Sequence, residues 1–169
     1  MTLQPRHTAP LYTPEQRRRR DATPWTLVQG LLAPAQFLVF AVSLVLVLRA
    51  LATGHGVAAA SVSVVVKTLF LYAIMVTGAI WEKRVFDCYL FAPAFYWEDV
   101  FSMLVIALHT AYLAALFTGW LGTRGQLLLA LAAFATYIVN ATQFILKLRA
   151  ARLGERQSQA ESAPLAGAM

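Results

Sequence analysis

The sequence predicts an all-α integral membrane protein, a bundle of four transmembrane helices with both termini in the cytoplasm. Of its 169 residues, 59% are apolar and only 13% are charged, whereas a soluble domain has about 45–50% apolar and about 25% charged residues. This composition excludes a soluble globular enzyme, and it equally excludes a disordered protein, which needs low hydrophobicity and high charge. At about 20 residues per crossing, the chain holds four crossings, short loops and two tails, and hence one domain.

The first element is a polar segment at residues 1–23. Thr13, Pro14 and Gln16 are typical of the start of a short helix: a hydroxyl cap, a proline in the first turn, and a glutamine three residues after the cap. This helix would carry the four consecutive arginines at positions 17–20. We expect the segment to be a basic cytoplasmic flank of the membrane domain.

Four long apolar blocks follow, and they predict spanning helices at about residues 25–52, 57–82, 96–120 and 125–149, within a transmembrane domain of residues 24–149. A glycine-containing turn at residues 53–56 separates the first two blocks, and the longest loop, at residues 82–95, separates the next two. The polar, small residues 150–169 predict a flexible cytoplasmic tail.

The orientation follows from the distribution of lysine and arginine between alternate segments. One side of the membrane holds only Arg49 and Arg124, whereas the other holds Arg6, Arg17, Arg18, Arg19, Arg20, Lys83, Arg84, Lys147, Arg149, Arg152 and Arg156. Since cytoplasmic segments are rich in cations, both termini and the longest loop are predicted to be cytoplasmic. The net charge of +6 is therefore attributed to topology, and nucleic acid is excluded as a partner.

Common catalytic motifs are absent from the sequence. Cys88 is the single cysteine, which excludes an intramolecular disulfide and a cysteine-built metal cluster. The chain has no phosphate-binding loop, nucleophile elbow or dinucleotide fingerprint. The candidates for chemistry are therefore the polar residues inside the spanning helices, because such residues are costly there.

One group of these polar residues lies near the predicted midplane. Lys67, His109 and Gln36 fall at similar depths on three different helices, so they are expected to meet in the bundle centre. Lys67 is interpreted either as the structural partner of a carboxylate or as an anchor for an anionic substrate group. His109 has three interpretations: a hydrogen-bonded core histidine, an axial ligand of a macrocycle-bound metal, or a proton-transfer group.

A second group lies near the cytoplasmic edge and contains Glu82, Glu98, Asp99 and Asn140. At about 100° per residue, Glu98 and His109 point within about 20° of each other on the third spanning helix. Asn140 is interpreted as an interhelical hydrogen-bonding group or as a site residue.

The two carboxylates at positions 98 and 99 follow a run with five aromatic residues, Tyr89, Phe91, Phe95, Tyr96 and Trp97. One explanation is an aromatic belt at the membrane surface followed by acids that favour a helix N-terminus. The other is a flat aromatic ligand that stacks beside a general acid.

These residues belong to a wider resemblance. Over about residues 11–153 the chain resembles the 3-vinyl (formerly 2-vinyl) bacteriochlorophyllide hydratases of bacteriochlorophyll biosynthesis. The resemblance rests on four runs, LYTPEQRRRRD at 11–21, VTGAIWEK at 76–83, FAPAFYWED at 91–99 and LHTAY at 108–112.

The resemblance implies a hydratase, a carbon–oxygen lyase that adds water across the C3 vinyl group of a (bacterio)chlorophyllide to give a 1-hydroxyethyl group. It implies no resident cofactor, because the magnesium is part of the chlorin substrate. The expected partners are the pigment and membrane lipid, in the inner or intracytoplasmic membrane of a bacterium. Association with other pigment-biosynthesis enzymes and oligomerisation stay open.

Vinyl hydration requires a general acid, a positioned water and a flat apolar slot. We expect Glu98 to be the proton donor, with Asp99 or Glu82 as its partner or as the base for water. His109 is expected to bind the pigment magnesium or to orient water. The residues expected to bind the substrate are Phe91, Phe95, Tyr96, Trp97, Lys67 and Asn140.

Two other function classes remain. In the first, the chain is a non-catalytic chlorophyll-binding or assembly protein, in which His109 ligates magnesium and the acids are structural. In the second, it is a small transporter with Lys67 and His109 as a proton relay. A transporter should carry polar residues at every depth, whereas here they concentrate toward the cytoplasmic half.

Overall fold

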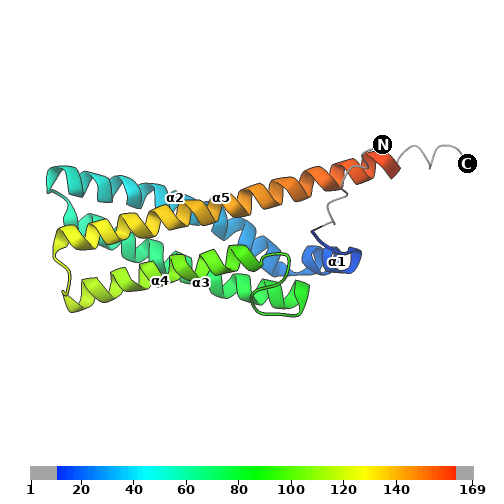
Figure 1. The fold of residues 1–169 in the computed structure, drawn as a ribbon, viewed down its shortest axis with the longest axis horizontal. Coiled ribbons are helices and arrows are strands. Elements are labelled where there is room, and N and C mark those ends of the chain that lie inside the picture. Colours follow the sequence, from blue (N-terminus) through cyan, green and yellow to red (C-terminus); the bar gives the residue numbers. More distant parts are fainter. Residues whose placement is uncertain (1–10, 163–169) are drawn as a thin grey trace, which may run out of the picture.

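The computed structural model describes residues 11–162, with side chains described through residue 154, and these residues form five α-helices and no strand (Figure 1). The helices are α1 (Pro14–Ala22), α2 (Pro24–Thr53), α3 (Val57–Phe86), α4 (Tyr96–Thr118) and α5 (Thr123–Ser162). The helices α2 to α5 are each long and apolar enough to cross a membrane. The predicted class, an all-α multi-pass membrane protein with four spans, is confirmed.

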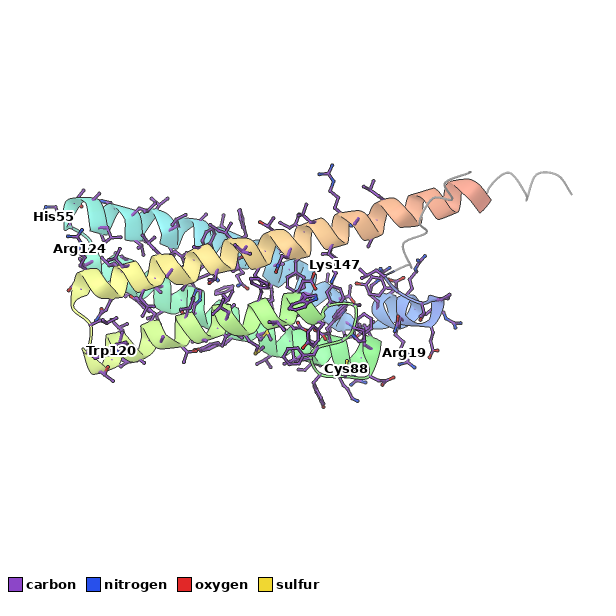
Figure 2. The ribbon with its side chains drawn as sticks, viewed as in Figure 1. Arg19, His55, Cys88, Trp120, Arg124 and Lys147 are labelled. Carbon is purple, nitrogen blue, oxygen red and sulfur yellow. The ribbon has the colours of Figure 1, made fainter. Side chains whose placement is uncertain are left out.

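The spans pair in the order of the chain. Helices α2 and α3 form one antiparallel hairpin and α4 and α5 form another, and packing is more extensive within each hairpin than between them. Figure 1 shows the α2–α3 and α4–α5 turns at one end of the bundle and α1 with the α3–α4 loop, residues 87–95, at the other. We call the latter the site end. Figure 2 shows Arg19 and Cys88 there, and His55, Trp120 and Arg124 at the opposite end.

The short first helix begins as its sequence predicts. The backbone N–H of Gln16 donates to Thr13 Oγ1 (3.2 Å), and the backbone N–H of Thr13 donates to Gln16 Oε1 (2.9 Å). This reciprocal capping box satisfies donors that a helix start leaves free, and Pro14 occupies the first turn, where its missing N–H costs nothing. Residues 1–10, and with them Arg6, lie outside the described part of the chain.

The spans end where the backbone enters the left-handed region. Gly54 and Gly56, with φ of 71° and 77°, close α2 and open α3, and glycine adopts such angles without steric cost. At the site end α3 is closed by Asp87, a non-glycine residue with φ of 66°. The tight reversal at residues 53–56 is the turn that the sequence predicts.

Two helices extend further than the apolar blocks suggest. Helix α3 ends at Phe86 instead of near residue 82, because Val85 and Phe86 pack with Tyr12 and Phe95 in a second core at the site end. Helix α5 continues to Ser162, well past residue 149. The segment 150–162, expected within a flexible tail, is thus helical in backbone. That it is a flexible cytoplasmic tail stays a prediction.

The bundle interior is lined by small and medium side chains that let the helices approach closely. Ala60, Ala115, Ala130 and Ala133 are fully buried, as expected where transmembrane helices associate by packing rather than by hydrophobic exclusion from water. Many large apolar side chains face outward, among them Leu38 and Phe117. The outward apolar surface suits lipid, and the inward surface is available for polar groups.

Candidate active site

Three carboxyl groups gather at the site end of the bundle, between the end of α3 and the start of α4. Glu82, Glu98 and Asp99 are 5%, 6% and 3% exposed. Glu82 comes from the last turns of α3, and the other two come from the first turn of α4. Their positions in the sequence predict one layer for these three acids, and the fold brings them together.

Glu82 and Asp99 form what we call the acid pair. Their side chains lie within hydrogen-bonding reach of each other, and because a carboxylate only accepts, a hydrogen bond between them requires a proton on one of them. Each group also accepts a backbone N–H from the α3–α4 loop: Ala92 N donates to Glu82 Oε2 (3.2 Å), and Phe91 N donates to Asp99 Oδ2 (2.7 Å). The pair is therefore built to hold one proton and one negative charge.

Glu98 has a different partner. Lys147 on α5 donates from Nζ to Glu98 Oε2 at 2.5 Å and also to the backbone oxygen of Ala94, and the ammonium lies 5.2 Å from the Phe95 ring centroid. An ammonium in direct contact favours the ionised carboxylate. Glu98 thus lies in an ion pair with Lys147, whereas the two members of the acid pair face each other.

Lys147 is a residue of this site that was not predicted from the sequence, where it is one of the cations that indicate the cytoplasmic side. A signal was present: Lys147 lies on the same helical stripe as the inward residues of α5, because Tyr137, Asn140, Phe144 and Lys147 follow one another at spacings of three, four and three. Continuing that stripe by one turn would have placed the ammonium beside the acids.

The aromatic run divides into two groups. Phe95 is buried and packs against Trp81, Phe86 and Phe144 at centroid distances of 5.8, 5.9 and 6.0 Å. It is therefore part of the core that supports the loop, and it does not face the outside. Tyr12 stacks on the same core.

Three of the other four aromatic residues form an exposed aromatic patch, and the fourth, Tyr89, is exposed elsewhere on the loop. Phe91, Tyr96 and Trp97 are 42%, 48% and 66% exposed, and Tyr96 lies 5.8 Å from Phe91 and 5.6 Å from Trp97 between ring centroids. Phe91 adopts φ of 60°, which is uncommon for a non-glycine residue. The bond from its N–H to Asp99 holds this strained backbone in place, so the patch and the acid pair are directly linked.

The predicted midplane group lies in a separate layer, deeper in the bundle. Lys67 and His109 are fully buried and close enough to interact electrostatically, and Lys67 Nζ lies 3.8 Å from the Tyr137 ring centroid. Gln36 is also buried, and its Oε1 has no hydrogen-bond partner in the described part of the chain. With 1.5 Å per residue, His109 lies about 16 Å along α4 from Glu98.

His109 makes one defined hydrogen bond. Its Nδ1 lies 2.8 Å from the backbone oxygen of Val105, which fixes Nδ1 as the protonated nitrogen because a carbonyl only accepts. Nε2 then presents a lone pair and finds no partner within the described residues. This nitrogen is a candidate for a single axial bond to a metal, but its ring is enclosed, 6.0 Å from that of Phe134.

The remaining polar residues join helices. Asn140 Nδ2 donates to Ser102 Oγ at 2.9 Å, so it links α5 to α4. This bond agrees with its interpretation as an interhelical group. Gln29 does the same between α2 and α3, donating to Thr77 Oγ1 at 2.7 Å.

The fold and the site together define a class: a small multi-pass membrane protein with a proton-sharing carboxyl pair beside an exposed aromatic patch at one end of a four-helix bundle. The 2-vinyl bacteriochlorophyllide hydratase family matches residues 12–150, and the chain belongs to this family.

Two curated relatives carry the same description. The chain is 69% identical over 143 residues to the 2-vinyl bacteriochlorophyllide hydratase of Rhodobacter capsulatus, covering 85% of this chain and 83% of the relative. It is also 69% identical over 150 residues to the 2-vinyl bacteriochlorophyllide hydratase of Cereibacter sphaeroides, covering 88% and 92%. No solved structure matches the chain significantly. The resemblance predicted from the four sequence runs is confirmed.

Proposed function

We propose that this chain adds water to the C3 vinyl group of a (bacterio)chlorophyllide and that the acid pair, Glu82 with Asp99, transfers the protons. Membership of the family makes the chain a hydratase of bacteriochlorophyll biosynthesis. The observation that carries the proposed mechanism is the juxtaposition of two buried carboxyl groups, each of which accepts a backbone N–H from the α3–α4 loop. Two carboxyl groups so placed can share one transferable proton.

The reaction needs two proton transfers, one from the protein to the pigment and one from water to the protein. In the first step the protonated carboxyl of the acid pair gives its proton to the terminal vinyl carbon, and the positive charge spreads from the inner carbon into the macrocycle. In the second step water attacks the inner carbon, and the carboxylate of the pair accepts the proton that this water loses. The pair returns to its starting state, and the balance is one water added.

The acid pair suits this role better than Glu98. Glu98 is engaged in an ion pair with the Lys147 ammonium, and an ion-paired carboxyl group is a poor proton donor. The pair instead holds its proton in a desolvated position, with two backbone N–H groups ready to stabilise the charge that develops when the proton leaves. Glu98 and Lys147 are assigned to holding the start of α4 and the loop in place.

The exposed aromatic patch is assigned to the macrocycle. Phe91, on the loop that covers the acid pair, and Tyr96 and Trp97, at the start of α4, present exposed rings that are inclined to their neighbours by 54° and 86°, so a macrocycle would stack on the face of one ring and contact the edges of the others. A pigment stacked there lies against the strained Phe91 backbone, and movement of this segment opens the way to the pair. Phe95 supports this loop from inside the bundle, as the core residue described above.

The setting of the enzyme follows from its sequence and family. We place it in the inner or intracytoplasmic membrane of a bacterium, with the site end toward the cytoplasm, because the site end carries Lys83, Arg84 and the arginines of α1. Lipid covers the outward apolar surface. Magnesium enters with the pigment, and oligomers or contacts with other pigment-biosynthesis enzymes are compatible with this arrangement.

The first prediction tests the reaction itself. Membranes that contain the wild-type chain should convert a 3-vinyl chlorophyllide into its 3-(1-hydroxyethyl) derivative, and in ¹⁸O-labelled water the new hydroxyl should carry the label. Chromatography with mass spectrometry measures both. Stoichiometric pigment that co-purifies with the chain but is never hydrated would contradict the proposal and favour a pigment-binding protein.

The second prediction concerns the deep layer. Replacing His109 by leucine removes a nitrogen that has no partner, so we expect the chain to fold and to hydrate pigment at a rate close to that of the wild type. Rates per folded protein, with folding followed by size-exclusion chromatography, measure this. A folded His109→Leu variant that has lost pigment affinity would instead support axial ligation of the pigment magnesium.

A further inference from the structure

The proposed mechanism leaves one cavity at the site end unused. A cleft of about 590 Å³ opens beside the last turns of α3, between α1 and the α3–α4 loop. We call it the basic cleft, because three of its lining side chains are cationic. The lining residues are Arg19, Ile80, Lys83, Arg84, Asp87 and Tyr89.

The single carboxylate of the basic cleft is already engaged. Arg19 donates to Asp87 Oδ2 at 2.6 Å and to Glu15 Oε1 at 2.6 Å. The Arg19 guanidinium holds the pKa of Asp87 below its ordinary value, so Asp87 stays ionised and bound at neutral pH. Lys83 contacts the same residue, donating from Nζ to the Asp87 backbone oxygen at 2.7 Å.

Arg84 is the cation of the basic cleft that has no partner within the described part of the chain. Within the described part of the chain its guanidinium makes no hydrogen bond, ion pair or ring contact, and it is exposed to the cleft. Lys83 keeps donor capacity as well, because only one of its three N–H groups is used. Three cations and one carboxylate therefore leave the cleft positively charged. The planar guanidinium of Arg84 is suited to binding a second carboxylate.

The basic cleft and Glu82 of the acid pair lie on opposite sides of the same turn of α3. Glu82, Lys83 and Arg84 are consecutive on α3, and successive side chains rotate by about 100°, so Glu82 points inward while the two cations point out. The separation is of the order of a helix diameter, about 10 Å. Tyr89, an exposed aromatic wall of the cleft, belongs to the loop that also carries Phe91.

We propose that Arg84 and Lys83 bind the free propionate carboxylate of the pigment, and that the basic cleft thereby selects chlorophyllide acids over their esters. The inference rests on the proposed function, because it takes the pigment from that reaction. In such a pigment the vinyl group and the propionate are carried by neighbouring rings of one flat macrocycle. A pigment stacked on the loop aromatics can then present its vinyl edge to the acid pair while its carboxylate reaches the cleft.

The experiment compares a 3-vinyl chlorophyllide with its methyl ester, using the full-length chain in nanodiscs of neutral phosphatidylcholine. Binding is followed by pigment absorbance, and turnover by chromatography. The wild type should bind the acid about tenfold or more tightly than the ester, as expected for a lost charge-assisted contact. Replacing both Arg84 and Lys83 by glutamine should raise KM for the acid to that for the ester and leave kcat and ester binding nearly unchanged.

Arg149→Gln is the matched control, since it removes one exposed cation of α5 outside the basic cleft. Equal affinity of the wild type for acid and ester would overturn the inference, and this comparison needs no variant. An acid preference that persists in the double variant would overturn the inference too. So would an effect of the double substitution that is seen only when phosphatidylglycerol is added to the nanodiscs, because that result would indicate a lipid headgroup site. If the wild type hydrates neither pigment, that result contradicts the proposed function instead.

Discussion

Replacing Glu82 by glutamine is expected to lower the rate of vinyl hydration by at least about 100-fold, within the range of about 10²–10⁴ that general acid–base catalysis contributes. Asp99→Asn should have an effect of similar size. In both variants an amide N–H replaces the shared proton, so the hydrogen bond between the two side chains persists while the transferable proton is lost. The amide oxygen can still accept the loop N–H of Ala92 or Phe91.

The double variant Glu82→Gln, Asp99→Asn should be no slower than either single variant, because the two carboxyl groups act as one unit. Single-turnover conversion of vinyl chlorophyllide by purified protein measures all three. Asp21→Asn is the matched control, since it neutralises an exposed acid of α1 that pairs with Arg20.

Glu98→Gln separates the acid pair from the alternative donor. If Glu98 supplied the proton, its glutamine variant would lose activity to the same extent as Glu82→Gln. We expect it instead to retain most of the rate per folded molecule. A folded, stable Glu98→Gln protein with no activity, beside an active Glu82→Gln protein, would return the role of proton donor to Glu98.

The four spans could be predicted because each apolar block is longer than any soluble helix needs and is bounded by polar or glycine-containing turns. The ends of the spans could not. Helix α3 runs on to Phe86 because that side chain packs against the rings of Tyr12 and Phe95, which come from other parts of the chain. Hydropathy alone carries no information about such a contact.

The inward face of α4 could also be predicted, since helical spacing places Glu98, Ser102 and His109 on one stripe, and all three are buried. The aromatic run that precedes it has no regular period. Its backbone turns through left-handed angles at Asp87 and Phe91, and these angles decide that Phe95 points into the core while Phe91 points out. From the sequence alone, the core residue Phe95 could therefore not be distinguished from the exposed aromatic residues beside it.

The partner of Glu98 could have been predicted but was obscured by a second valid interpretation. Lys147 does lie among the cations that predict the cytoplasmic side, and nothing in that count distinguishes an exposed cation from an inward one. Its spacing from Tyr137 and Asn140 does distinguish it. Near a membrane surface a cation can thus serve both topology and packing.

Replacing Lys147 by methionine is expected to destabilise the protein by about 2–3 kcal/mol, somewhat less than the loss of one partner from a fully buried ion pair. The Glu98 side chain is 8% exposed and would lose its ion-pair partner, and the backbone oxygen of Ala94 would lose its donor. Glu98→Gln should cost less, because the Lys147 side chain is 28% exposed and its ammonium can be hydrated. Thermal unfolding in detergent, followed by size-exclusion chromatography, measures the difference.

The decisive measurement is the double variant Glu98→Gln, Lys147→Met. Once the buried carboxylate is neutral, the missing ammonium no longer leaves a charge unpaired, so the double variant should be more stable than Lys147→Met alone, with a coupling energy of about 1–3 kcal/mol. Arg149→Met, two residues further along α5 and exposed, should leave the stability near that of the wild type. Additive effects of the two single substitutions would show that Glu98 and Lys147 do not stabilise one another, and the assignment of Glu98 to a supporting ion pair would then be lost.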